Sequence, residues 1–129
     1  MRYLWLIAIV LLLGGCQAPD DRLLDPREAM DMIQRHRDDA DFLLIDARTP
    51  EEFRLGHIAG ARLINYYDPD FSDQLDSLDR NALILFYCRS GNRTSHVLKM
   101  AHRRGFARVY DLRGGILAWQ QAGFSLVRP

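Results

Sequence analysis

Residues 82–93 read ALILFYCRSGNR, and this stretch decides the fold class. Its first six residues are apolar without a break, which is typical of a strand buried on both faces of a parallel sheet. A single cysteine, Cys88, follows in a loop that contains glycine and two arginines. A helix is predicted from residue 93, so N–H groups of the loop and of the helix N-terminus would point positive charge at the sulfur. A thiolate can persist in such a place.

The flanking sequence alternates between strand and helix patterns. Strands are predicted at residues 42–45, 62–65, 82–87 and 107–111, and helices at residues 26–37, 50–55, 93–104 and 116–122; residues 68–78 fit a helix or a loop. Two helices open with capping signatures, DPRE at residues 25–28 and TPEE at residues 49–52. This alternation predicts an α/β domain with a mostly parallel sheet covered by helices on both faces.

Length, net charge and the spacing of the histidines argue against several classes of function. The chain has 129 residues, enough for one domain and too few for two ordinary ones. Its formal net charge is zero, so no nucleic-acid partner is expected. The histidines lack the spacing of metal ligands, and His57 fits a structural role in a turn. We therefore expect no metal and no cofactor, and we expect a monomer.

The N-terminus has the pattern of a sorting signal. Residues 3–13 carry no charge, and this run is shorter than the ~20 apolar residues that cross a bilayer, so it fits a secretory signal. It ends in LGGC at residues 13–16, which resembles the lipobox of bacterial lipoproteins. That resemblance implies cleavage before Cys16 and lipidation of its sulfur. An ordinary signal peptide or signal anchor with an incidental cysteine is the alternative.

On the lipoprotein interpretation the chain has three parts. Residues 1–15 are the signal peptide, residues 16–22 a tether, and residues 23–129 the folded domain; no strand is predicted before residue 26. The lipid would hold the domain on a membrane, facing the periplasm. Gln17 is not the Asp associated with inner-membrane retention, which favours the outer membrane. Because Cys16 would be consumed as a thioether, Cys88 would be the only remaining thiol.

Over residues 23–124 the chain resembles a single-domain rhodanese, of the thiosulfate sulfurtransferase family. The motifs that carry the resemblance are, in order, LIDAR at 44–48 with EEF at 51–53, GHI at 56–58 with GA at 60–61, YCRSGNRT at 87–94, and GGI at 114–116 with AW at 118–119. The resemblance implies about five parallel strands flanked by helices, with the active loop between the central strand and its helix.

The resemblance also implies a chemistry. Cys88 would be the nucleophile that takes a sulfur atom from a donor, holds it as a persulfide, and passes it to a thiol or to cyanide. The rest of the loop would bind the donor; these residues are Arg89, Ser90, Gly91, Asn92 and Arg93. Thiosulfate is a dianion, so the two arginines favour it or another inorganic sulfur anion.

Asp46 and Arg48 follow a neighbouring strand, and the resemblance places this pair near the site. They would support the loop, or form an ion pair that is purely structural. One other class of function stays open for the whole chain, and a second is argued against. A non-catalytic persulfide carrier or rhodanese-like binding module in the cell envelope would keep the same loop. A phosphatase of this architecture would need arginine at position 94, which is threonine here.

Overall fold

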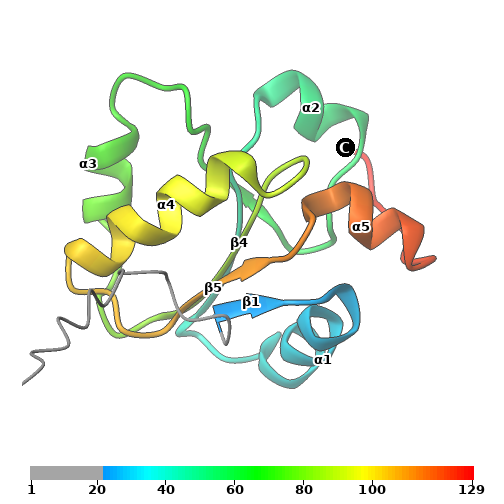
Figure 1. The fold of residues 1–129 in the computed structure, drawn as a ribbon, viewed down its shortest axis with the longest axis horizontal. Helices are drawn as coiled ribbons and strands as arrows, with labels where there is room; N and C mark the ends of the chain where they lie inside the picture. The colour runs from blue at the N-terminus through cyan, green and yellow to red at the C-terminus, as the bar shows by residue number, and fades with distance from the viewer. Residues whose placement is uncertain (1–21) are drawn as a thin grey trace, which may run out of the picture.

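Five parallel strands form one sheet in the order β1-β5-β4-β2-β3 (Figure 1). The computed structural model describes residues 22–129. The predicted signal peptide, Cys16 and the tether up to residue 21 lie outside the described residues. The strands are β1 (Leu23–Leu24), β2 (Phe42–Asp46), β3 (Arg62–Leu63), β4 (Leu83–Tyr87) and β5 (Val109–Leu112). The predicted α/β class with its parallel sheet is confirmed.

Four helices connect the strands, and a fifth follows the last strand. They are α1 (Pro26–His36), α2 (Pro50–Leu55), α3 (Phe71–Asp76), α4 (Asn92–Arg103) and α5 (Gly115–Gln121). Both predicted capping boxes are present, at the starts of α1 and α2. Residues 68–78, read as a helix or a loop, contain the short helix α3. Among residues 22–129 no helix is long and apolar enough to span a membrane.

Each face of the sheet has its own apolar core. One core packs α3 and α4 against alternate residues of the strands, such as Ile45, Ile84 and Val109. The other packs α1 and α5 against the intervening residues, such as Leu44 and Leu85. Figure 1 shows these two helix pairs on opposite sides of the strands. Side chains alternate in direction along a strand, so β4 can be buried on both faces.

Strand β1 was not predicted, and its absence from the prediction has a simple cause. It contains two residues, too few for a periodic pattern, and pairs only at the edge of the sheet, where Leu23 lies opposite Asp111. The other strands and helices agree with the predicted ones to within a few residues at their ends.

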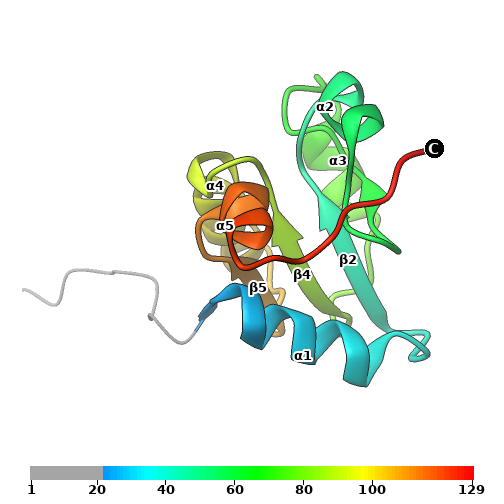
Figure 2. The ribbon, with the colours of Figure 1, turned by 90° about the vertical axis from the view of Figure 1, so that its right-hand side faces the viewer.

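Figure 2 shows a further contact that the sequence did not indicate: the C-terminal segment runs from α5 toward α2, where Val127 pairs with His57.

The order of the strands determines where a site can form. β4 lies at the centre, between β2 and β5, and all three strands end at the same edge of the sheet. The loop at residues 88–91 follows β4 and leads into α4, whereas Gly114 follows β5 and leads into α5. Ligands of open parallel sheets bind at the carboxyl ends of the strands. The cysteine loop is therefore at the expected edge.

Candidate active site

The sulfur of Cys88 lies at the N-terminus of α4. The residue is 1% exposed. The backbone N–H of Gly91 donates to its Sγ at 3.1 Å, and the Thr94 hydroxyl lies 3.4 Å from Sγ, with either atom as donor. Gly91 has a φ of 97°, a left-handed conformation that favours glycine and turns this N–H toward the sulfur. Sγ therefore lies beside a backbone N–H that donates to it and a hydroxyl within hydrogen-bond distance.

Helix α5 holds the same loop from behind. The N–H groups of Ile116 and Leu117 donate to the carbonyls of Cys88 and Arg89, at 2.9 and 3.1 Å. This approach is so close that a Cβ on Gly115 would lie 2.5 Å from the Arg89 carbonyl oxygen. Gly115 also has a φ of 62°. The sequence indicated a turn at Gly114-Gly115, and the structure shows that the second glycine also makes room for the loop.

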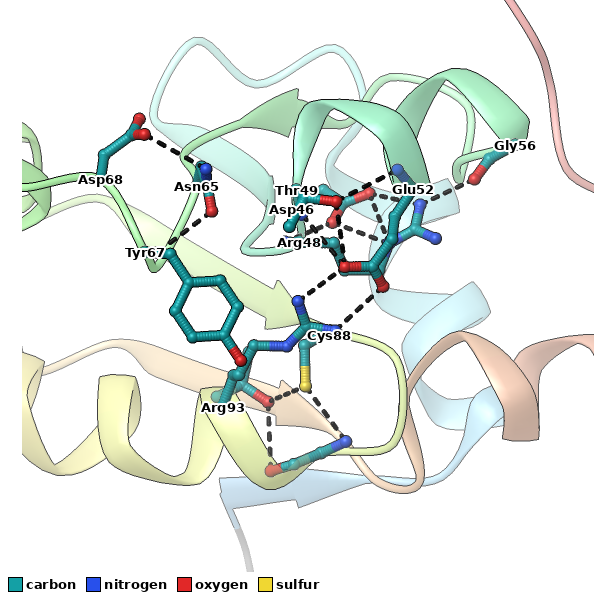
Figure 3. A network of polar contacts seen from close by, with 12 residues as sticks. Asp46, Arg48, Thr49, Glu52, Gly56, Asn65, Tyr67, Asp68, Cys88 and Arg93 are labelled. Carbon is teal, nitrogen blue, oxygen red and sulfur yellow. Dashed lines mark hydrogen bonds and ion pairs between the residues drawn. The ribbon is translucent and has the colours of Figure 1, made fainter.

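Arg93 is held by a carboxylate on another helix. Its two terminal nitrogens donate to the two carboxylate oxygens of Glu52, at 2.8 and 3.0 Å (Figure 3). Both groups are partly buried, with 14% of the Arg93 side chain and 26% of the Glu52 side chain exposed. The hydrogen bonds from Arg93 lower the pKa of Glu52 to about 2, although burial acts the other way. The same bonds raise the pKa of Arg93.

Glu52 has a second role that the sequence did predict. It is the third residue of α2, and it forms a capping box with Thr49. The capping signature therefore identified Glu52 as a structural residue. Its contact with Arg93 joins positions 41 residues apart, so no local pattern could indicate it. Tyr67, which is 63% exposed, lies on the other side of Arg93, with the guanidinium 5.5 Å from the ring centre.

Asp46 and Arg48 form a buried ion pair. Arg48 donates to both carboxylate oxygens and to the carbonyl of Gly56, with the shortest distances at 2.7 Å. Burial opposes the charge of Arg48, but the hydrogen bond and the charge of Asp46 outweigh it and raise its pKa. The hydrogen bonds of this pair within residues 22–129 tie the end of β2 to the end of α2. The link from this pair to the loop is indirect. The charge of Arg48 interacts with Glu52, and Glu52 in turn binds Arg93 of the loop.

The remaining loop residues point outward. Arg89, Ser90 and Asn92 are all exposed. Within residues 22–129 the Arg89 side chain has no ion pair, whereas the charge of Arg93 is balanced by Glu52. Arg89 is therefore the uncompensated cation of the loop.

His57 stacks on Phe53 with ring centres 3.7 Å apart, in agreement with the structural role expected for it.

Comparison with known proteins gives the family. The family description "Rhodanese-like domain" matches residues 25–122. The chain belongs to the rhodanese-like domain family.

Its relatives in this family include proteins named sulfurtransferases. The chain is 34% identical to a protein named sulfurtransferase from Allochromatium vinosum, over 76% of this chain and 90% of the relative. It is also 34% identical to a probable adenylyltransferase/sulfurtransferase from Mycobacterium tuberculosis, over 81% of this chain but only 26% of that longer protein. A rhodanese-related protein from Thermoplasma volcanium shares the fold, with a TM-score of 0.70 and 23% identity over 82% of this chain and 97% of that one.

The close approach of Gly115 to the loop gives a testable prediction. Gly115→Ala should lower the free energy of unfolding by about 1–3 kcal/mol more than Gly123→Ala, because its methyl group would overlap the loop carbonyls. Gly123 is a matched control, since it has a similarly positive φ of 86° but open space around its Cβ position. Urea unfolding of both variants measures the difference. Equal losses would show that the loop moves aside freely.

Proposed function

We propose that this protein is a sulfurtransferase that carries sulfur on Cys88 and takes it from thiosulfate or a similar small sulfur anion. The observation that carries the proposal is the position of Sγ, between the Gly91 N–H and the Thr94 hydroxyl at the start of α4. The family's sulfurtransferase relatives support the same class of reaction. A donor that presents a single terminal sulfur atom suits this buried nucleophile better than a bulky one does.

The proposed reaction has two steps that balance. In the first, the Cys88 thiolate attacks the outer sulfur of thiosulfate; an S–S bond forms, the bond to the sulfonate breaks, and sulfite leaves with that electron pair. Cys88 then carries a persulfide anion. In the second, a nucleophile such as cyanide or a thiolate attacks the outer sulfur, and Cys88 leaves as a thiolate. Covalent capture thus divides one transfer into two easier ones.

Sulfur loading tests the nucleophile directly. Brief exposure of the full chain to thiosulfate should add the mass of one sulfur atom, and peptide mass spectrometry should place it on the peptide containing Cys88. Cyanide should remove it with release of thiocyanate. The added mass should be absent in Cys88→Ser, because a serine hydroxyl does not form a persulfide.

The outcomes separate the two functions left open by the sequence. Loading that cyanide cannot reverse, without catalytic turnover, would indicate a carrier or a binding module instead of an enzyme. Loading that persists in Cys88→Ser would show that another group carries the sulfur.

The two loop arginines should have different effects. Arg89→Ala should weaken the use of thiosulfate and reduce its dependence on salt, because an exposed steering charge is screened within ~8 Å at physiological ionic strength. Its thermal stability should stay near that of the wild type. Arg93→Ala should lower activity and also lower the free energy of unfolding by roughly 1–3 kcal/mol, since it leaves Glu52 without its partner.

Glu52→Gln is the matched variant for the structural part of this effect. It should reproduce much of the stability loss of Arg93→Ala while leaving both arginines in place. Lysine at either arginine position keeps the charge but loses the planar fork, so partial recovery would indicate simple electrostatics. An unchanged thiosulfate dependence in Arg89→Ala would refute the anion-recognition argument and favour a neutral donor.

We also propose that a lipid on Cys16 anchors the protein in a bacterial cell envelope, facing the periplasm and on the outer membrane rather than the inner. The support is the LGGC motif at residues 13–16 after a short uncharged run. The wild type should fractionate with membranes, and Cys16→Ser with a conventional cleavage site supplied should be soluble in the periplasm. Detection of unmodified Met1 on the mature wild-type protein would contradict the anchor.

A further inference from the structure

A cluster of cationic side chains lies at the amino ends of β1, β5 and β4, at the edge of the sheet opposite Cys88. Helix α4 begins four residues after Cys88 and ends at this opposite edge, where the chain turns into β5 (Figure 1). We call the cluster the basic edge; its members are Arg22, Arg80, Lys99, Arg103, Arg104 and Arg108. None of these six side chains is buried.

Hydrogen bonds to backbone carbonyls hold three of the guanidinium groups at this edge. Arg80 donates to the carbonyl of Arg104 at 2.9 Å, and Arg22 donates to the carbonyl of Ala107 at 2.6 Å. Arg108 donates to a carbonyl in the turn before β4 at 3.1 Å. These bonds leave the positive charge in place, because a carbonyl group is neutral. The basic edge is therefore one surface, built from three segments that are far apart in the sequence.

Two aspartates neutralise part of this charge. Asp76 forms ion pairs with Arg80 and Arg104, and Asp41 forms an ion pair with Arg108. Between 31% and 55% of each of these side chains is exposed. Ion pairs as exposed as these are weak, and their partners can be exchanged for other ions at little cost.

The charge along this edge of the sheet is uneven. The turn before β2, residues 37–41, contains one arginine and three aspartates, and Asp79 is exposed in the turn before β4. Near β5, by contrast, Lys99 and Arg103 are exposed and form no ion pair within residues 22–129. Helix α4, which carries both, has no acidic residue. The excess of positive charge therefore lies at the end of α4, beside β5 and β1.

The N-terminal segment of the chain joins the domain at the same place. Arg22 is the first described residue, and β1 begins at Leu23 beside β5. Cys16, the proposed site of the lipid, precedes Leu23 by seven residues. An extended chain covers at most about 3.6 Å per residue, so a lipid on Cys16 lies within roughly 25 Å of the amino end of β1. An anchor at this position holds the basic edge close to a membrane surface.

We propose that the basic edge lies against the anionic headgroups of the membrane that carries the anchor, and that Cys88 faces away from that membrane. Lysine and arginine side chains near an anionic lipid surface are attracted to it, and a basic surface strengthens the attachment given by a lipid. The orientation rests on the N-terminal anchor proposed above, whereas the affinity of the basic edge for anionic lipid does not.

This orientation suits a site that takes an anionic donor. Helix α4 has 12 residues and rises about 1.5 Å per residue, so the cysteine loop stands about 18 Å above the basic edge. The negative potential of a membrane surface decays over ~8 Å at physiological ionic strength, so only roughly a tenth of it remains at that height. A small sulfur anion therefore reaches Cys88 with little repulsion from the lipid.

Vesicle binding tests the basic edge without the lipid. The chain with Cys16→Ser and a supplied cleavage site is purified from the periplasm. It is sedimented with vesicles of phosphatidylcholine and phosphatidylglycerol, or of phosphatidylcholine alone. It should bind the anionic vesicles, and binding should fall as salt is raised, because the attraction is electrostatic. Binding to neither kind of vesicle, or equal binding to both, would overturn the proposal.

Charge reversal locates the contact. Lys99→Glu together with Arg103→Glu should weaken binding to the anionic vesicles at least tenfold, roughly as expected for the loss of two cations near a lipid surface. Arg27→Glu together with Arg54→Glu is the matched control. It makes the same change in net charge on exposed residues of α1 and α2, in helices that follow the carboxyl ends of β1 and β2, and should weaken binding much less. Equal losses in the two double variants would refute a contact at the basic edge.

Fluorescent labels report which end of the domain meets the membrane. In a background of Cys16→Ser and Cys88→Ser, a polarity-sensitive dye is attached to His102→Cys near the end of α4, or to Ser90→Cys in the cysteine loop. Both positions are exposed. The emission from position 102 should shift to shorter wavelength when anionic vesicles are added, and the emission from position 90 should not. A shift at position 90 as large as that at position 102 would overturn the orientation.

The outcomes separate this proposal from those made above. Vesicle binding as expected, with an unmodified Cys16 in cells, would support the basic edge and refute the lipid anchor. A lipidated Cys16 without vesicle binding would support the anchor and refute the basic edge. Neither result bears on sulfur transfer, which the loading of Cys88 tests separately.

Discussion

The contact between α5 and the backbone of the cysteine loop is the constraint on which the rest of the site depends. Two N–H groups of α5 hold the carbonyls of Cys88 and Arg89, and the absence of a side chain at Gly115 allows the approach. While α5 holds these two carbonyls, the backbone N–H of Gly91 in the same loop points toward Sγ. The surroundings of the sulfur thus depend on two glycines, Gly91 beside Sγ and Gly115 beside the backbone of the loop.

Most of the charged side chains at the site are neutralised in ion pairs. Asp46 with Arg48 and Glu52 with Arg93 form two ion pairs, so these four charged side chains add no net charge to the site. A bidentate pair fixes geometry as well as charge, and here it joins α4 to α2. The loop's net attraction for an anion is left to the exposed Arg89. The paired residues thus fix the shape of the site, whereas Arg89 carries the exposed positive charge of the loop.

Local patterns predicted most of the fold and the position of Cys88 after the central strand. The apolar runs and capping boxes identify their strands and helices because their signals lie within a few residues, and the loop motif likewise places Cys88. The edge strand at Leu23-Leu24 escaped prediction because two residues have no periodicity, and only β5 makes them a strand. Glu52 escaped as a site residue because it meets Arg93, 41 residues away in the sequence, only after the sheet has formed.

The order of the strands has a consequence for synthesis of the chain. β4 gains its second neighbour only when β5 exists, and β1, the first strand among residues 22–129, pairs with that same late strand. The donors that fasten the cysteine loop belong to the last helix. A ribosome-bound chain that ends before residue 117 therefore lacks part of the hydrogen bonding that holds the loop around Cys88. The hydrogen bonds that hold the loop around this sulfur are therefore completed only when the last helix has been made.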